Sequence, residues 1–348
     1  MTTRRIIYWF RNNLRLHDQP VLKALEGQSD VLLLPVFCFD ERWFYNTPAG
    51  FPKTGSIRAG FLLESVYNLK ENLNKLHSDL LIAFGKPEDV LADIARAFCA
   101  GEICAEKEDT TEEVFVENAL KKRVKIPVRF HESKTLLPAN QLPFSISSLP
   151  DIFTNFKNKI EPLLHQVESI DPPEKLPPLP AGFESGKRIN IHVFGLTETA
   201  FDSRAACSFT GGESAGLDRL HKYIWLDKAI LHYKETRNQL IGENYSSKLS
   251  AWLANGSLST RKVYAEVKKF EKNVQANEST YWLVFELLWR DYFRFVARKY
   301  GSRIFLKGGI KNKTPDYKDD TQLFEKWRTG KTGNDFVDAN MTELLKTG

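Results

Sequence analysis

Five short apolar runs alternate with helical patterns over the first 131 residues, and this alternation restricts the possible folds more than any other feature. Continuous apolar runs such as residues 30–40 are typical of parallel strands that are buried on both faces. Between the runs lie segments with apolar residues at helical spacing, for example residues 57–76. Parallel strands need such crossover segments. The sequence therefore predicts an α/β domain with a doubly wound parallel sheet over residues 1–131.

The rest of the chain divides into two parts of different character. Prolines recur through residues 132–200 and prevent any long element there, so we predict an interdomain connector. From about residue 211 strand signals nearly vanish and helical periodicity takes over, which predicts an all-α domain over residues 201–348. The last residues, DANMTELLKTG, have a helical pattern with no closing element after them. We therefore expect this domain to be truncated at its C-terminus.

Composition argues against several classes of protein. No apolar run reaches the roughly 18 residues of a membrane-spanning helix, and the N-terminus does not resemble a signal peptide. The four cysteines show neither CxxC spacing nor a disulfide pattern, and the seven histidines are scattered. Neither GxGxxG nor GxxxxGK[ST] occurs, so no dinucleotide site or P-loop is indicated. We predict a reduced, cytoplasmic protein with no metal site and no membrane segment.

Positive charge is concentrated in the second half of the chain. The net charge is +5, and residues 261–313 contain 13 Lys and Arg against 5 Asp and Glu. Such a segment suits a polyanion such as nucleic acid, and a solvated helical surface explains it equally well.

A carboxylate interrupts an aromatic stripe in STYWLVFELLWRDYFRF, residues 279–295. At helical spacing Trp282, Glu286, Trp289 and Phe293 fall within about 40° of one another. Burying an acid without a partner costs several kcal/mol or raises its pKa. From the pattern alone, Glu286 is either on a cavity wall or a core acid paired with Arg290 or Arg294.

Serine residues are concentrated in ENYSSKLSAWLANGSLSTRKVY, residues 243–264. Hydroxyls, free backbone N–H groups and a lysine at a helix start would suit a phosphate or pyrophosphate. The alternative is two ordinary serine N-caps, the second of them at Ser257 or Ser259. On this stretch alone the capping interpretation is favoured.

Blocks of sequence spread over essentially the whole chain resemble the photolyase/cryptochrome family. In their amino-acid sequence and their order along the chain they are most similar to the cryptochrome DASH branch. This resemblance implies a two-domain flavoprotein, with an antenna pigment beside the α/β domain and a U-shaped FAD in the helical domain. The blocks are IIYWFRNNLRLHDQPVL, KTGSIRAGFLLESV, DLLIAFGKPEDVL, LPDIFTNFKNKIE, GGESAGLDRLHKYIW, YKETRNQLIGENYSSKLSAWLANGSLSTRKVY, STYWLVFELLWRDYFRF and KWRTGKTGNDFVDANMTELLKTG.

The resemblance also implies a function. In the family, blue or near-ultraviolet light excites a reduced flavin, which donates an electron to a cyclobutane pyrimidine dimer flipped out of DNA. DASH members resemble deoxyribodipyrimidine photo-lyases that prefer single-stranded DNA, where extrusion from a duplex is avoided. Two alternatives stay open: a non-catalytic blue-light photoreceptor and an inactive truncated fragment. We expect a monomer.

Individual site residues carry over from the family's motifs. Glu286 matches the glutamate that forms a hydrogen bond with the dimer, and a raised pKa would also let it donate that bond. Trp289 matches the aromatic residue that stacks on the flipped bases. Glu108 aligns with an acid placed against a 5,10-methenyltetrahydrofolate antenna, with a solvated acid at a helix start as the alternative. The residues matched to FAD binding are Tyr233, Ser246, Ser247, Lys248, Leu249, Ser250, Trp282, Glu286 and Arg290.

The chain departs from the family pattern in three places. Asn13 stands where relatives usually have Asp, which predicts a local loop change. Tyr317 occupies the place where the electron relay usually ends in a surface Trp. The sequence ends before the expected stretch FMSNRGRQ, which belongs to the segment with further flavin contacts, relay tryptophans and part of the DNA cleft. We therefore expect weak or no flavin binding by the 348-residue form.

Overall fold

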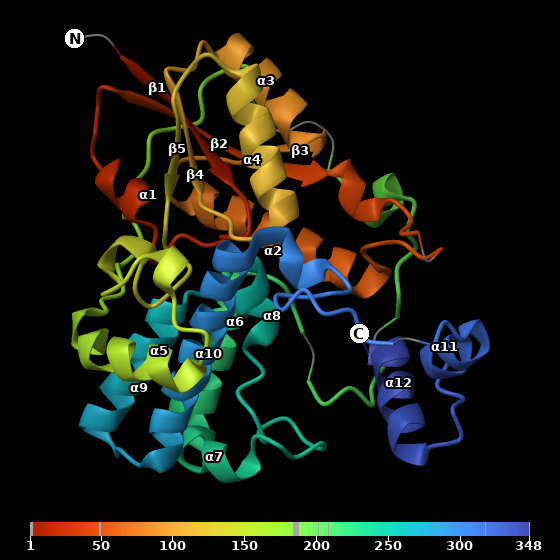
Figure 1. Cartoon of the computed structure of the whole chain (residues 1–348). Coiled ribbons are helices and arrows are strands. Elements are labelled where there is room, and N and C mark those ends of the chain that lie inside the picture. Colours follow the sequence, from red (N-terminus) through yellow and green to blue (C-terminus); the bar gives the residue numbers. More distant parts are fainter. Residues whose placement is uncertain are drawn as a thin grey trace.

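The computed structural model describes residues 3–48, 50–183, 188–200, 202–207, 209–316 and 318–347. An α/β domain and a helical domain pack against each other, with helix α10 running through the helical domain up to the boundary (Figure 1). The predicted combination of a doubly wound parallel-sheet domain with a helical domain is confirmed.

The α/β domain contains a five-stranded parallel sheet in the order β3-β2-β1-β4-β5. The central strand β1 pairs with both neighbours, and Ile7 lies opposite Leu34 on one side and Ile103 on the other. The strand order reverses at β1, because the chain adds β2 and β3 on one side of it and then β4 and β5 on the other side. The strands are β1 (Arg4–Phe10), β2 (Val31–Asp40), β3 (Leu81–Gly85), β4 (Glu102–Glu106) and β5 (Val128–His131).

Helices cover both faces of this sheet because alternate residues of each strand point to opposite sides. Tyr8 packs with Leu69 of one helical layer, whereas Ile7 and Trp9 pack with Leu91 and Leu120 of the other. The helices and turns of this domain are α1 (Pro20–Ala24), the 3₁₀ turn η1 (Glu41–Phe44), α2 (Ser56–Lys75), α3 (Pro87–Phe98) and α4 (Thr111–Arg123).

The connector belongs to both cores. Its first half packs into the helical domain through Leu137 and Phe156, and its second half returns to the sheet through Leu176 and Phe194. Prolines keep its elements short. They are η2 (Ala139–Gln141), η3 (Ile146–Ser148), α5 (Phe153–Ile160), η4 (Glu161–Gln166) and η5 (Ile191–Phe194).

The helical domain is built around α10, which begins with an Asn277–Thr280 capping box and buries Leu283, Leu287 and Leu288. Among the described residues, none of the helices combines the length and apolarity that crossing a membrane requires. Helices α11 and α12 lie to one side of the α5–α9–α10 group (Figure 1). The elements are α6 (Glu213–His221), the π-helical turn η6 (Lys222–Leu226), η7 (Ala229–His232), α7 (Tyr233–Thr236), α8 (Ser250–Asn255), α9 (Thr260–Asn273), α10 (Glu278–Tyr300), η8 (Gly301–Phe305), α11 (Thr321–Arg328) and α12 (Asp335–Thr347).

Buried polar groups join the two domains. Arg15 of the loop after β1 donates to the carbonyls of Gly256 and Ser133, at 2.9 and 3.0 Å. In return the Glu213 carboxylate of α6 accepts the backbone N–H groups of Leu16 and His17, at 3.0 and 2.9 Å. Asn13 of the same loop is fully buried and accepts the Arg11 N–H. This loop therefore fixes how the two domains are placed.

Candidate functional site

Glu286 lies on the half-exposed face of α10 and forms an ion pair with Arg237. Its Oε1 atom is 2.9 Å from Nη1 of Arg237, and 31% of its side chain is exposed. The Arg237 guanidinium also lies 5.5 Å from the centre of the Trp282 ring. Glu286 is thus neither sealed in the core nor paired with Arg290 or Arg294, so that alternative is wrong.

Arg290 points toward the connector and α8 instead, and Arg294 points toward the α/β domain. Arg290 donates to the carbonyls of Lys134 and Leu253, at 2.7 and 3.1 Å, and burial lowers its pKa to about 10. Arg294 forms an ion pair with Asp109. The Arg290 guanidinium is therefore committed to contacts with the connector and α8, and its assignment as a flavin ligand stays a prediction.

Trp289 stands inside a stack of aromatic rings along α10. Its ring is parallel to that of Phe153 at 3.6 Å, and Phe293 stacks on it at 5.4 Å. Phe293 is 60% exposed, so the accessible end of the stack is its ring. The stack supplies the flat apolar surface that a base would need.

The serine segment forms a loop wrapped around the buried guanidinium of Arg219. This guanidinium donates to the carbonyls of Ser246 and Ser247, at 3.2 and 3.0 Å, and to the side chain and carbonyl of Glu243. Arg219 therefore orients the backbone of the loop. Lys248 follows with a left-handed φ of 59° and lies 3.8 Å from the Tyr245 ring.

The capping interpretation holds for only one of the two serine groups. Ser259 caps α9 by accepting the N–H groups of Arg261 and Lys262. The N-cap of α8 is Leu249, without a side-chain cap, and its neighbour Ser250 is exposed. Within the described ranges the hydroxyls of Ser246, Ser247 and Ser250 have no protein partner. They are therefore available to a ligand.

Helix α7 joins the serine loop to α10. Thr236 donates to the Tyr245 carbonyl at 2.8 Å on one side, and Arg237 reaches Glu286 on the other. Tyr233, the first residue of α7, is buried, and burial together with the Glu286 charge raises its pKa to about 12. Its phenol is therefore neutral at physiological pH.

Two buried donors at this site have no partner in the described part of the chain: Nε1 of Trp282 and Nε of Arg237. An unpaired buried donor is costly, so a polar ligand would be favoured beside them. Together with the free serine hydroxyls, these donors fit a large ligand that has both a phosphate and a polar ring edge. The residues present thus fit FAD, with Arg219 and Arg237 as contributors that the sequence analysis missed.

Glu108 lies in a buried cluster of charges at the domain boundary and is only 4% exposed. It forms an ion pair with Lys134, accepts from Asn12 Nδ2 at 3.1 Å, and lies 3.7 Å from Arg294. Burial alone would raise its pKa, but the charges of Lys134, Arg11 and Arg294 outweigh burial and hold the pKa at about 2. The interpretation as a solvated acid is therefore wrong.

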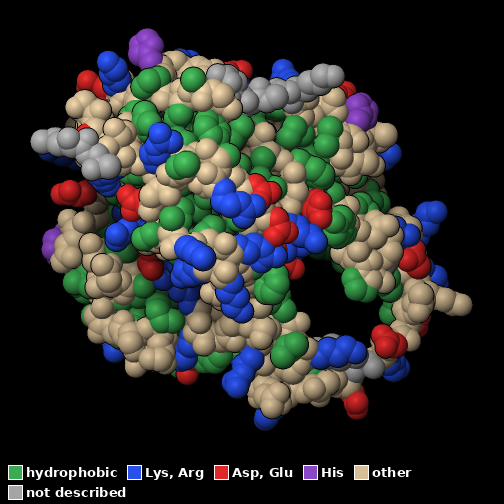
Figure 2. Space-filling model, turned by 90° about the horizontal axis from the view of Figure 1, so that it is seen from above, with side chains coloured by type: hydrophobic (Ala, Val, Ile, Leu, Met, Phe, Trp, Pro, Cys, Tyr) green, Lys and Arg blue, Asp and Glu red, His purple; other side chains and the backbone are tan. Residues whose placement is uncertain are grey.

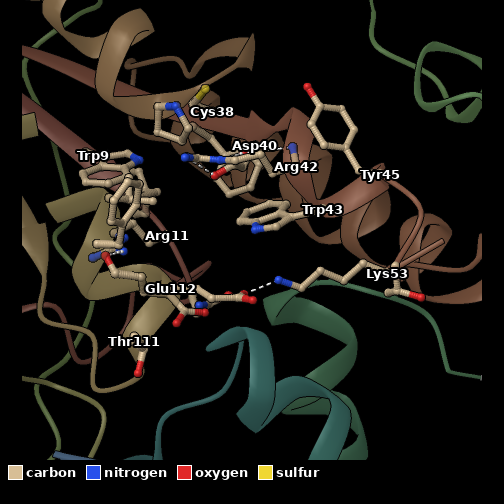
Figure 3. A pocket seen from close by; sticks show the side chains of 18 of the residues that line it. Trp9, Arg11, Cys38, Asp40, Arg42, Trp43, Tyr45, Lys53, Thr111 and Glu112 are labelled. Carbon is tan, nitrogen blue, oxygen red and sulfur yellow. Dashed lines mark hydrogen bonds and ion pairs between the residues drawn. The ribbon is translucent and has the colours of Figure 1, made fainter. Parts of the chain in front are cut away.

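Two cavities adjoin this cluster. The first, of about 510 Å³, lies between α4 and the end of α10 and is lined by Glu108, Phe115 and Arg298 among others. The second, of about 580 Å³, lies at the carboxyl ends of the strands, where parallel sheets usually bind ligands. Figure 3 shows Trp9, Arg42 and Trp43 around it. Sequence reasoning did not single out this second cavity.

Tyr317, the predicted relay residue, lies outside the described residues.

Comparisons with known proteins agree with this geometry. Residues 6–180 match the family model described as DNA photolyase, and residues 282–348 match the FAD binding domain of DNA photolyase. A parallel-sheet domain joined to such a helical domain defines a photolyase-like flavoprotein. The chain belongs to the photolyase/cryptochrome family, in the cryptochrome DASH branch.

The individual relatives are similar over nearly the whole chain. Cryptochrome DASH of Gloeobacter violaceus is 43% identical, covering 100% of this chain and 70% of its own length. Cryptochrome DASH of Xenopus laevis is 44% identical, covering 99% of this chain and 67% of its own length. The solved structure of a Synechocystis cryptochrome has a TM-score of 0.94 at 43% identity, covering 100% of this chain and 72% of that one.

Proposed function

We propose that this chain belongs to a light-dependent enzyme that splits cyclobutane pyrimidine dimers, with a preference for single-stranded DNA. The observation that carries the proposal is the half-exposed, charge-paired Glu286 between Trp282 and Trp289, on the side of α10 that faces α7 and the serine loop. A carboxylate in this position can read the polar edge of an extruded base while the aromatic stack supports its face. In single strands the cost of extrusion is avoided.

Bound FAD would supply, when reduced and excited by blue or near-ultraviolet light, the electron that splits the dimer. The chain's own residues hold and orient both partners. Ser246, Ser247 and Lys248 would hold the phosphates, and the Trp282 N–H would meet a polar edge of the ligand. Glu286 and Arg237 would fix the dimer and balance charge beside it.

Basic side chains beyond α10 support the assignment of DNA as a partner. The sequence count over residues 261–313 overstates the free positive charge, because Arg294, Arg298 and Lys299 of α10 are held in ion pairs with acids of other segments. Arg303, Lys307, Lys311 and Lys313 are exposed and form no ion pair within the described residues. Figure 2 shows Lys and Arg side chains gathered across the middle of one face. Phosphate binding by such residues is independent of sequence.

Replacing Glu286 by Gln tests the proposal. The amide keeps the size but loses the charge, so we expect dimer splitting under illumination to fall about tenfold, the effect of about 1.4 kcal/mol in a charged hydrogen bond. The measurement is thymine restored in dimer-containing oligothymidine. Glu278→Gln is the matched control, because its side chain is 65% exposed in the first turn of the same helix.

The wild-type protein decides between repair and sensing. A wild-type chain that photoreduces its flavin but restores no thymine contradicts the proposal and favours the photoreceptor. Equal repair by wild type and Glu286→Gln would show that the carboxylate has no part in the reaction.

We further propose a 5,10-methenyltetrahydrofolate antenna in the cavity beside Glu108. The cavity is lined by acidic and basic side chains together with Phe115, which suits a ring with polar edges. Val114→Trp should narrow this cavity and lower pigment retention about tenfold, measured by near-ultraviolet absorbance of the purified protein. Thr47→Trp narrows the strand-end cavity and should leave retention unchanged. The reverse result would place the pigment in the strand-end cavity.

A further inference from the structure

The hydroxyl of Tyr223 is buried without a hydrogen-bond partner in the helical domain. The Tyr223 side chain is 0% exposed, and its oxygen has no partner within the described ranges. Burial raises the pKa of this phenol, so the hydroxyl keeps its proton at physiological pH. A buried hydroxyl that makes no hydrogen bond is destabilising. Either an internal water or a bound ligand would satisfy it.

The position of Tyr223 favours the ligand. Tyr223 lies in the π-helical turn η6, and such turns are rare and frequently found at functional sites. Its ring lies 5.3 Å from the guanidinium carbon of Arg219, which holds the serine loop of residues 243–248. Its ring also lies edge-on to that of Tyr233, the first residue of α7, at 6.4 Å and 88°. Tyr223 therefore lies where the support of the serine loop meets α7.

The charge of Arg219 is already used by the serine loop. Each N–H group of its guanidinium has an acceptor in that loop: the side chain and carbonyl of Glu243, the side chain of Asn244, and the carbonyls of Ser246 and Ser247. The Glu243 carboxylate, 2.9 Å away, also balances the positive charge. A phosphate beside this loop would therefore depend on further donors, and a neutral phenol is one.

We propose that the Tyr223 hydroxyl donates a hydrogen bond to the pyrophosphate of bound FAD, in addition to the hydroxyls of the serine loop. This inference rests on the FAD assignment within the proposed function and adds a donor from outside the matched motif. The phenol would then strengthen binding of the dinucleotide, because a hydrogen bond to an anion is stronger than one between neutral groups. In the FAD-free protein the same hydroxyl stays unpaired and adds nothing to stability.

The test compares FAD affinity with the stability of the FAD-free protein in Tyr223→Phe, which removes one oxygen atom. We expect the dissociation constant for FAD, measured in the dark by quenching of flavin fluorescence, to rise about tenfold. The urea midpoint of the FAD-free protein should stay the same or rise, because an unpaired buried hydroxyl has been removed. An internal water as the partner predicts the reverse pattern, a lower midpoint with unchanged affinity.

Tyr264→Phe is the matched control. Tyr264 is buried in the same core, but its hydroxyl donates to the Leu164 carbonyl at 3.0 Å. This variant should lower the urea midpoint by about 0.3 M and leave FAD affinity unchanged, the opposite of Tyr223→Phe. Phosphorus NMR of bound FAD gives a further readout. The pyrophosphate resonances should shift in Tyr223→Phe and stay in place in Tyr264→Phe.

The outcomes separate the inference from the proposed function. If wild type binds FAD more tightly than Tyr223→Phe but restores no thymine under illumination, the inference is supported and the proposed function is contradicted. An FAD affinity in Tyr223→Phe equal to that of wild type overturns the inference. So does a lowered urea midpoint in that variant, an unshifted pair of phosphorus resonances, or a wild-type protein that binds no FAD.

Discussion

Glu108→Gln should lower the free energy of unfolding by about 3 kcal/mol at neutral pH, because it leaves the buried Lys134 ammonium without its partner. Burial already lowers the pKa of Lys134, so the lysine can lose its proton and thereby limit the cost. Asn12 Nδ2 would keep an acceptor in the new amide oxygen. Urea unfolding of both proteins measures the difference.

The pH dependence of stability gives a second test of the Glu108–Lys134 ion pair. The pKa of Glu108 is about 2 in the folded chain, below its ordinary value of 4.5. Its contribution is therefore complete above about pH 4.5 and is lost as the pH falls toward 2. The stability difference between wild type and Glu108→Gln should shrink over that range. Glu112→Gln, whose side chain is 69% exposed beside Lys53, should cost less than about 0.5 kcal/mol, and an equal loss in both variants would refute the buried-pair argument.

Gly256→Ala is the second large effect. Gly256 has a left-handed φ of 71°, and a Cβ there would lie 2.0 Å from the carbonyl oxygen of Asn12 and 2.7 Å from the Cα of Asn13. Both obstacles are backbone, so the loop after β1 must move away from the helical domain. We expect a loss of roughly 3 kcal/mol or more, which thermal or urea unfolding would measure.

Gly195→Ala separates the clash from the backbone strain. Gly195 has nearly the same φ, 70°, and a Cβ there would meet nothing within 4 Å. It should therefore cost only the strain of a left-handed alanine, about 1 kcal/mol. An equal loss of unfolding free energy in the two variants would show that the close approach of residue 256 to Asn12 does not affect stability.

The fold could be predicted from the sequence wherever a pattern is local. The apolar run of residues 30–40 forms β2, and residues 56–75 form α2, because periodicity alone specifies such elements. The stripe of Trp282, Glu286 and Trp289 likewise depends only on helix geometry, and these side chains do share a face of α10. The α9 cap at Ser259 is equally local.

The features that could not be predicted from the sequence depend on contacts between distant segments. Arg237 meets Glu286 across 49 positions of sequence, and nothing near either residue marks the pair. Arg219 reaches Ser246 and Ser247 in the same way. A count of charges over residues 261–313 could not tell Arg294 and Arg298, which are tied to Asp109, from the exposed Lys311. Tertiary structure decides which charges are free.

The loop after β1 limits how a ligand can enter. If the two domains moved apart, the N–H groups of Leu16 and His17 would lose their acceptor, the Glu213 carboxylate. The Arg15 guanidinium would lose the Gly256 carbonyl. Hinge motion between the domains is thereby made expensive. The proposed pigment and base would instead have to enter through rearrangement of side chains at the cavity mouths, so that access depends on small local movements while the two domains keep their relative placement.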